Sequence, residues 1–74
     1  MTELVTFMVK SLVDKKDAVE VTLADDGVIN VKVDKDDIGK VIGKDGRIAK
    51  AIRTIVKAAA NKQQVKYTVV ILEE

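Results

Sequence analysis

Two glycines three residues apart, Gly43 and Gly46, separate two segments whose apolar residues repeat at helical spacing. Because glycine adopts positive φ at no steric cost, the pair lets the main chain end one helix, turn tightly and begin the next. The first N–H groups of a helix have no partner within it, and the helix dipole favours an anion near them. The spacing therefore predicts a corner between two helices that can hold a phosphate group.

Positive charge gathers around this glycine turn. Lys44 lies inside it, Lys40 precedes it, and Arg47 and Lys50 follow it. The glycine spacing alone is weak evidence, since glycine makes up about 7% of average proteins. The surrounding cations favour an anionic ligand, and a phosphodiester chain suits them better than a free nucleotide does. The alternative is an ordinary structural corner, with Asp45 as the N-cap of the second helix.

Other phosphate-binding and catalytic motifs are absent from the sequence. A P-loop requires Gly-x-x-x-x-Gly-Lys-Ser/Thr, whereas Gly39 and Gly43 are one residue too close and Asp45 follows Lys44 in place of a hydroxyl. The chain contains no Cys and no His, so it lacks disulfides, the usual zinc ligands and the usual general base. Ser11 is its only serine. We therefore expect no enzymatic activity, no metal and no cofactor.

Length and charge describe a small chain with uneven halves. We expect its 74 residues to form one domain, residues 1–74, with a small core. Residues 1–38 hold five Lys and nine acidic residues, a net charge of −4, whereas residues 39–74 hold eight Lys or Arg and three acidic residues, a net charge of +5. A basic half is typical of a polyanion-binding surface, although a solvated face explains the charge alone equally well. Short apolar runs and the lack of a basic leader favour a soluble, cytoplasmic protein.

Hydrophobic periodicity predicts six elements in the order helix, strand, strand, helix, helix, strand. In chain order they are expected at residues 2–13, 19–23, 29–33, 36–42, 46–60 and 65–71. Thr2 is placed to cap the first helix, the aspartates at positions 34, 36 and 37 are cap candidates for the short helix, and Gly43 stops it. An α+β fold, in which three helices cover one face of a three-stranded sheet, is the simplest way to bury every apolar stripe.

The turn between the first two strands decides their register. A two-residue loop would place Leu23 opposite Asn30 and mix apolar and polar residues on one face. A three-residue loop, residues 25–27 with Gly27 left-handed, keeps the apolar residues together. The pairs expected from this loop are Leu23 with Ile29, Val21 with Val31 and Val19 with Val33.

These residues resemble a known family. The segment VIGKDG at residues 41–46, followed by Arg47, Ile48 and Ile52, is similar to the signature of KH-domain RNA-binding proteins. The order of the elements matches the type II (prokaryotic) arrangement of KH domains. The longer stretches 38–60 and 9–21 closely resemble the KhpA family of small stand-alone bacterial KH proteins. The resemblance covers essentially the whole chain.

The resemblance implies binding of single-stranded RNA. In KH domains the Gly-x-x-Gly loop clamps the backbone of about four unpaired nucleotides. Carried over, Gly43 and Gly46 shape the clamp, Lys44 and Asp45 face the phosphates, and an apolar groove holds the bases. An edge strand floors this groove, and residues 29–33 are expected to provide it. The expected RNA-binding residues are Lys40, Val41, Ile42, Gly43, Lys44, Asp45, Gly46, Arg47, Ile48 and Lys50.

The resemblance also implies partners and a cellular role. Members of this family self-associate, pair with a second KH protein of the KhpB type, and act as RNA chaperones or post-transcriptional regulators linked to cell elongation and division. Asp45 departs from what a clamp prefers, because its carboxylate repels a phosphate. We therefore expect modest, salt-sensitive affinity from one domain, which a dimer would raise.

Two other functions stay open on the sequence alone. One is a protein-interaction module with a KH shape, which would use apolar residues of the long helix, namely Ile55, Ala58, Ala59 and Ala60. The other is binding of single-stranded DNA, because no residue is identified as a reader of the 2′-hydroxyl of RNA.

The remaining aromatic and basic residues carry less weight. Phe7 and Tyr67 are the only aromatic residues, fewer than the exposed rings that stacking platforms use. Phe7 is expected in the core, and Tyr67 on the same side of its strand as Val65 and Val69, where packing is the favoured role. Arg53 and Lys57 lie two or three turns beyond the glycine turn, so a solvated helix face explains them as well as extended RNA contact does.

Overall fold

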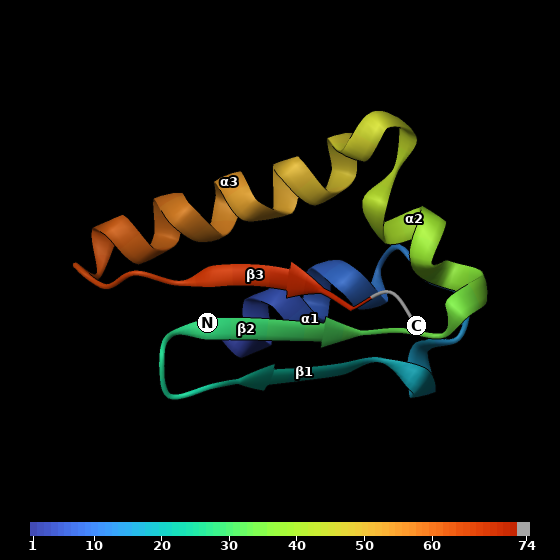
Figure 1. Cartoon of the computed structure of the whole chain (residues 1–74), viewed down its shortest axis with the longest axis horizontal. Helices are drawn as coiled ribbons and strands as arrows, with labels where there is room; N and C mark the ends of the chain where they lie inside the picture. Colours follow the sequence, from blue (N-terminus) through green and yellow to red (C-terminus); the bar gives the residue numbers. More distant parts are fainter. Residues whose placement is uncertain (73–74) are drawn as a thin grey trace.

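The computed structural model describes residues 1–72. Within them it contains three α-helices and a three-stranded mixed sheet (Figure 1). The elements are α1 (Thr2–Lys10), β1 (Glu20–Leu23), β2 (Val28–Lys32), α2 (Ile38–Ile42), α3 (Arg47–Lys62) and β3 (Thr68–Ile71), with 3-10 turns η1 (Lys16–Ala18), η2 (Lys35–Asp37) and η3 (Lys44–Gly46). The predicted α+β class and the order of its elements are confirmed.

β2 is the central strand of the sheet, paired antiparallel with β1 and parallel with β3. After β2 the chain passes through α2 and α3 and returns beside β2 as β3, which lies between β2 and α3 (Figure 1). The expectation that residues 29–33 form an edge strand is therefore wrong, because this crossover covers the second side of β2. β3 is the edge strand on the side of the sheet next to α3, the helix that follows the glycine turn.

The register of the first two strands agrees with the sequence. Leu23 lies opposite Ile29 and Val21 opposite Val31, as predicted, and the third predicted pair falls just beyond the end of the ladder. Gly27 has φ of 83° and closes the turn by donating its N–H to the Ala24 carbonyl oxygen at 3.0 Å. The three-residue loop is therefore confirmed.

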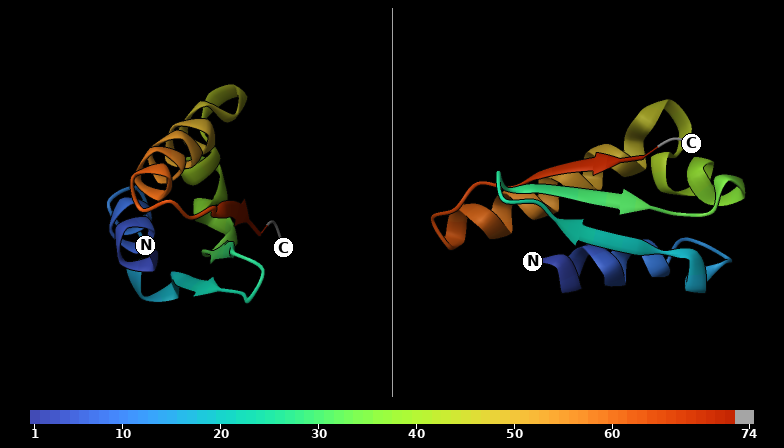
Figure 2. Two further views of the ribbon diagram at one scale, coloured as in Figure 1. Left: turned by 90° about the vertical axis from the view of Figure 1, so that its left-hand side faces the viewer. Right: turned by 60° about the horizontal axis from the view of Figure 1, so that its bottom comes forward.

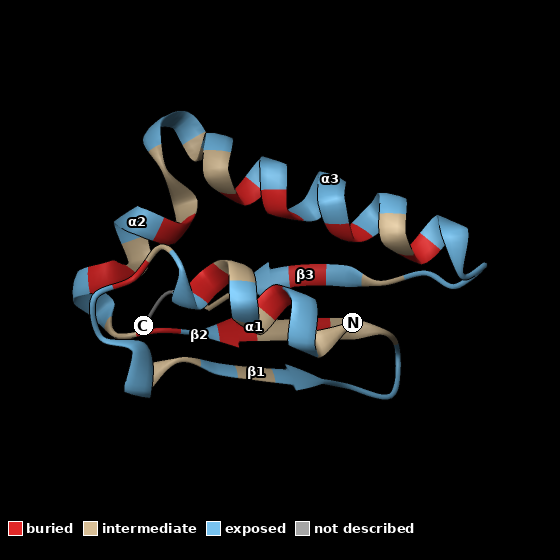
Figure 3. Ribbon diagram, turned by 180° about the vertical axis from the view of Figure 1, so that it is seen from behind, coloured by how far each residue is buried: buried red, intermediate tan, exposed pale blue. Residues whose placement is uncertain are grey.

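The core is small and entirely aliphatic. α1 and α3 lie on the same side of the sheet, and α2 lies beyond the end of β2 (Figures 1 and 2). Buried positions follow the inner sides of the helices and the two strands β2 and β3 (Figure 3). The buried residues of this cluster are Val5, Val9, Val13, Ile29, Val31, Val33, Val41, Ile52, Val56 and Val69.

Two predictions for α1 are wrong. Phe7 was expected in the core, yet 71% of its surface is exposed. Val5 and Val9 fill the inward positions, and Phe7, two residues from each, lies about 200° away around the helix. Thr2 does not cap α1. It is the first residue of the helix, and Met1 is the N-cap.

β3 begins three residues later than the predicted strand. α3 ends at Lys62, and Gln64 then adopts a left-handed conformation with φ of 59°. The N–H of Val65 donates back to the carbonyl oxygen of Ala60 at 3.0 Å, which is the hydrogen bond of a Schellman motif. Residues 65–67 therefore form a loop held against the end of α3 before Thr68 enters the sheet.

Candidate nucleic-acid interface

The glycine turn forms a tight corner between α2 and α3. α2 ends at Gly43 (φ 76°, ψ 176°), whose N–H donates to the Gly39 carbonyl oxygen at 2.8 Å. Gly46 is left-handed (φ 74°, ψ 15°) immediately before α3 begins. Its N–H donates to the carbonyl oxygen of Gly43 at 3.2 Å. Both glycines occupy conformations that other residues rarely adopt, so the shape of the corner depends on them.

The two glycines are required for different reasons. A Cβ added at Gly43 would lie 2.6 Å from Cγ1 of Ile48 and 2.9 Å from its Cβ and Cδ1. No heavy atom lies within 4 Å of a Cβ added at Gly46. Position 43 therefore lacks both room and a suitable φ, whereas position 46 lacks only the suitable φ. Ile48, half-buried on the first turn of α3, packs directly on the main chain of the corner.

Asp45 is exposed and left-handed, with φ of 58° and ψ of 24°. Aspartate visits this region more readily than most residues because its short polar side chain tolerates it. The interpretation of Asp45 as the N-cap of α3 is wrong, since Gly46 is the N-cap and no side chain caps it. The first N–H groups of α3 are therefore left without a side-chain acceptor.

Three of the predicted cations surround the corner with exposed side chains. Lys44 lies in η3, and Arg47 and Lys50 lie in the first turns of α3. None of the three forms an ion pair with a residue in the range 1–72. Arg47 borders an apolar groove between α1 and α3, together with Phe7. The structure thus leaves these cations available, with Arg47 turned toward α1.

Lys40, the fourth predicted cation, is held elsewhere. Its ammonium group donates to the carboxylate of Asp14 and lies 3.4 Å from a carboxylate oxygen of Asp37. The hydrogen bond to Asp14 raises the pKa of Lys40 above its ordinary value. Lys40 therefore stabilises the base of α2 through acidic partners and is less available to an anion than Lys44 is.

Asp37 is the centre of a polar cluster below α2. It is 2% exposed, and its carboxylate accepts the N–H of Lys15 at 3.0 Å, which lowers the pKa of Asp37. The ammonium of Lys15 pairs with Asp34 at 3.4 Å and Asp36 at 2.9 Å. Of the three predicted cap candidates, Asp34 caps η2 by accepting the N–H of Asp36 at 2.9 Å.

No group of three or more Asp, Glu, His or Cys residues within residues 1–72 is arranged to hold a metal ion.

The predicted apolar groove is only partly exposed. Val41 is 0% exposed and belongs to the core, so it supports the corner from beneath and has no surface for a ligand. Ile42 and Ile48 are half-buried beside the glycines, and Ile48 lines the groove between α1 and α3. The edge strand next to α3 is β3, whereas the sequence predicted residues 29–33 for this place.

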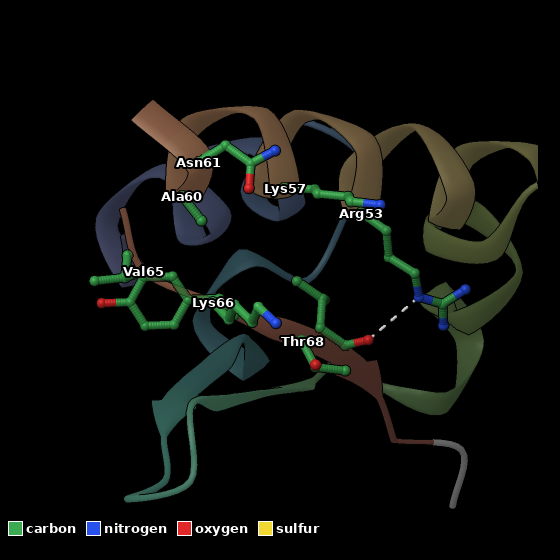
Figure 4. A pocket seen from close by; sticks show the side chains of 9 residues that line it. Arg53, Lys57, Ala60, Asn61, Val65, Lys66 and Thr68 are labelled. Carbon is green, nitrogen blue, oxygen red and sulfur yellow. Dashed lines mark hydrogen bonds between the residues drawn. The ribbon is translucent and has the colours of Figure 1, made fainter. Parts of the chain in front are cut away.

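Arg53 joins α3 to the edge strand. Its Nε donates to the carbonyl oxygen of Val69 in β3 at 3.2 Å (Figure 4). A merely solvated helix face does not explain this contact, so Arg53 is a residue to which sequence reasoning gave too little weight. The available signal is its position three residues after Lys50, which places both side chains on one side of α3.

The glycine corner and its cations lie within a segment that matches a known protein family. The model of the KhpA/KhpB KH domain matches residues 2–71 of the chain. The chain belongs to the KhpA/KhpB KH-domain family.

Relatives in this family match nearly the whole chain. RNA-binding protein KhpA of Clostridium perfringens is 55% identical, with 97% of this chain and 100% of the relative covered. RNA-binding protein KhpA of Caldanaerobacter subterraneus is 52% identical over the same shares. RNA-binding protein KhpA of Borreliella burgdorferi is 42% identical, with 96% of this chain and 90% of the relative covered. No solved structure matched the chain with significance.

Membership of the KhpA/KhpB family accounts for the main features of the molecule. The Gly-x-x-Gly corner, the α-β-β-α-α-β order and the mixed sheet are those of a type II KH domain, and this family is not a class of enzymes. Among the described residues, every helix is too short or too polar to cross a membrane.

Proposed function

We propose that this KH-domain protein binds single-stranded RNA at the corner between α2 and α3. The observation that carries the proposal is the corner itself. Gly43 and Gly46 expose the start of α3, and Lys44 extends from the turn without an ion-pair partner among residues 1–72. A phosphate placed there would meet the positive end of the α3 dipole, which no side chain caps, and an ammonium group. The similar KhpA proteins are named RNA-binding proteins.

The bases of the bound strand would lie between α3 and β3. Ile42 is half-buried beside the corner, and Lys50 and Arg53 extend the positive charge toward the edge strand. A KH clamp of this size holds about four nucleotides. The contacts expected here are shape, aliphatic packing and backbone hydrogen bonds, with little reading of sequence.

Association with a second KH domain would raise this affinity. Asp45 is exposed at the tip of the corner and makes no capping hydrogen bond that would offset its charge. Its repulsion of phosphate weakens binding by a single domain, and two linked domains compensate through effective concentration. We propose that the protein acts in the cytoplasm as a homodimer or with a KhpB-type KH protein. Its role would be that of an RNA chaperone or post-transcriptional regulator, with the family's link to cell elongation and division.

Reversing the charge of Lys44 tests the site. Lys44→Asp should weaken binding of a fluorescent single-stranded RNA by at least about tenfold, since a hydrogen bond to a charged group contributes about 1.5–3 kcal/mol. Lys10→Asp, an exposed lysine on α1, is the charge-matched control and should retain most of the affinity. Both variants should keep the wild-type circular dichroism spectrum and melting curve. Equal affinity of Lys44→Asp and wild type would reject the site.

One observation favours a second function, docking of a protein partner. Phe7 is 71% exposed and Ile55 is 47% exposed, and both line an apolar groove between α1 and α3. Large exposed aromatic and aliphatic residues that share a groove are typical of interaction surfaces. The predicted contribution of Ala60 to this surface is wrong, because Ala60 is 2% exposed and faces the core.

The two functions can be separated on purified protein. If the α1–α3 groove is the self-association surface, Phe7→Ser should convert the protein to monomers in sedimentation experiments while leaving intrinsic RNA affinity at the corner intact. If the groove is the only functional surface, wild-type protein should retain no RNA even at low salt. Competition between RNA and DNA oligomers of the same sequence would test the remaining alternative, single-stranded DNA.

A further inference from the structure

A second concave surface lies on α3, away from the glycine corner. It is a hollow of about 340 Å³ between the last turns of α3, the loop at residues 65–67 and β3 (Figure 4). Its apolar part includes Ala60, Val65, Tyr67 and Val69, and Arg53 and Lys57 lie at its edge. No acidic residue of the described chain lines it. An apolar floor with a basic rim suits a ligand that is flat and apolar in one part and anionic in another.

The hollow is built into the fold. The loop wall begins at the Schellman motif of α3, in which the Gln64 N–H donates to the Asn61 carbonyl oxygen at 3.1 Å and the Val65 N–H to Ala60 at 3.0 Å. It ends where the N–H of Thr68 donates to the carbonyl oxygen of Gly27 at 3.0 Å. Both ends of the loop are therefore held by main-chain hydrogen bonds, so a ligand would not have to order it.

The hollow is continuous with the proposed RNA site. Lys50, Arg53 and Lys57 are spaced three and four residues apart, so they follow one side of α3 from the corner to the hollow. Between Gly46 and Lys57 the helix axis advances about 16 Å. From Gly46 to Leu72 the sequence contains no Asp or Glu, so no carboxylate of that segment interrupts the path. Arg53, which is bound to β3, is the residue of α3 lining the hollow that lies nearest the corner along the helix.

We propose that this hollow seats the base of a nucleotide beyond those held at the glycine corner. The base packs on the apolar floor beside the ring of Tyr67, and the ammonium of Lys57 meets the adjoining phosphate. Lys57 is exposed and forms no ion pair within residues 1–72, and Tyr67 is partly buried, which fixes its ring. Stacking and aromatic contacts of this kind tolerate any base. The inference rests on the proposed function and extends the RNA footprint along α3.

The length of the RNA distinguishes this subsite from the corner. We would titrate wild-type protein with single-stranded RNA of about four and about seven nucleotides, following amide signals by NMR so that weak binding is measurable. Lys57→Glu should leave affinity for the short RNA within about twofold and weaken binding of the longer RNA by about tenfold. Lys62→Glu, which changes the same charge on α3 outside the hollow, is the matched control and should affect both lengths alike.

Tyr67→Ala provides a second test. This variant should lose the extra affinity of the longer RNA over the shorter one, as Lys57→Glu does. Its melting curve will report any loss of packing, since Tyr67 contacts the core. Equal losses at both lengths in Lys57→Glu and Lys62→Glu would overturn the subsite and leave the corner intact. Absence of wild-type binding at either length would instead reject the proposed function. An acidic peptide would be titrated in parallel. If Lys57→Glu binds RNA of both lengths as wild type does, and the amide signals of residues 65–67 shift only with the peptide, the hollow is assigned to a protein partner.

Discussion

Replacing Gly43 with alanine tests the packing that fixes the corner. The added Cβ would lie 2.6–2.9 Å from three side-chain atoms of Ile48, and overpacking of this kind costs about 1–3 kcal/mol. The backbone at φ 76° and ψ 176° belongs to a region that is essentially restricted to glycine and costs other residues about 1–3 kcal/mol more. We therefore expect Gly43→Ala to lose about 2–6 kcal/mol of the free energy of unfolding.

Gly46→Ala is the matched control for this experiment. Position 46 has a similar φ of 74° but no heavy atom within 4 Å of the added Cβ, so only the left-handed conformation is penalised, by about 1–2 kcal/mol. For a domain of this size total stability is of order 4–11 kcal/mol, so the difference decides whether the variant folds. Urea denaturation followed by circular dichroism measures both variants.

A double variant isolates the clash from the backbone strain. Ile48→Ala removes Cγ1 and Cδ1, two of the three atoms that the new Cβ would meet. In Gly43→Ala/Ile48→Ala the total loss should be smaller than the sum of the single losses by about 1 kcal/mol or more. If Gly43→Ala is no more destabilising than Gly46→Ala, or if the double variant is additive, the packing of Ile48 on Gly43 is not what shapes the corner.

Three further predictions follow from the charges of the molecule. The pKa of Asp37 is lowered from 3.8, chiefly by the N–H of Lys15 with help from Lys40. The ionised Asp37 carboxylate therefore stabilises the fold above about pH 4, and this contribution is lost as the pH falls below that value. In thermal melts, the melting temperature of Asp37→Asn should decline less steeply toward pH 3 than that of wild type. Asp45→Asn, which keeps a residue tolerant of positive φ and removes the repelling charge, should bind RNA several-fold more tightly in fluorescence anisotropy, and unchanged affinity would show that the carboxylate lies away from the phosphate. Raising the salt from 50 to 200 mM should weaken binding with a slope of about −0.7 per phosphate neutralised, whereas a flat response would point to apolar docking.

Much of the fold could be predicted because the local signals agree with one another. Alternating apolar residues fixed the register of β1 and β2, and the chemistry of Gly27 fixed the length of their turn. The clear amphipathic pattern of α3 and the stop at Gly43 placed the corner correctly. At these positions local preference, periodicity and tertiary packing favour the same structure.

The errors fall where tertiary contacts decide. Nothing in the pattern of β2 reveals that β3 returns to pair with its second side, since buried central strands and half-buried edge strands can read alike. Phe7 was assigned to the core by its hydrophobicity, yet its phase on α1 directs it to solvent. Periodicity placed Val65 in a strand, whereas the left-handed Gln64 turns that residue back onto α3.

The candidate site was predictable in outline and less so in its charges. The corner and the exposed Lys44 follow from the sequence. That Lys40 pairs with Asp14 does not, because the two residues are far apart in sequence and meet only through the fold. The contact of Arg53 with β3 depends in the same way on the return of the edge strand beside α3.

The central claim is that a phosphate of unpaired RNA rests on the main-chain amides of the glycine corner. Titration of isotopically labelled protein with a short single-stranded RNA at low salt tests it most directly. We predict that the amide signals of residues 43–47 shift first and furthest, and that they stay in place in Lys44→Asp at the same RNA concentration. Shifts confined to the groove between α1 and α3, with residues 43–47 unmoved, would contradict it.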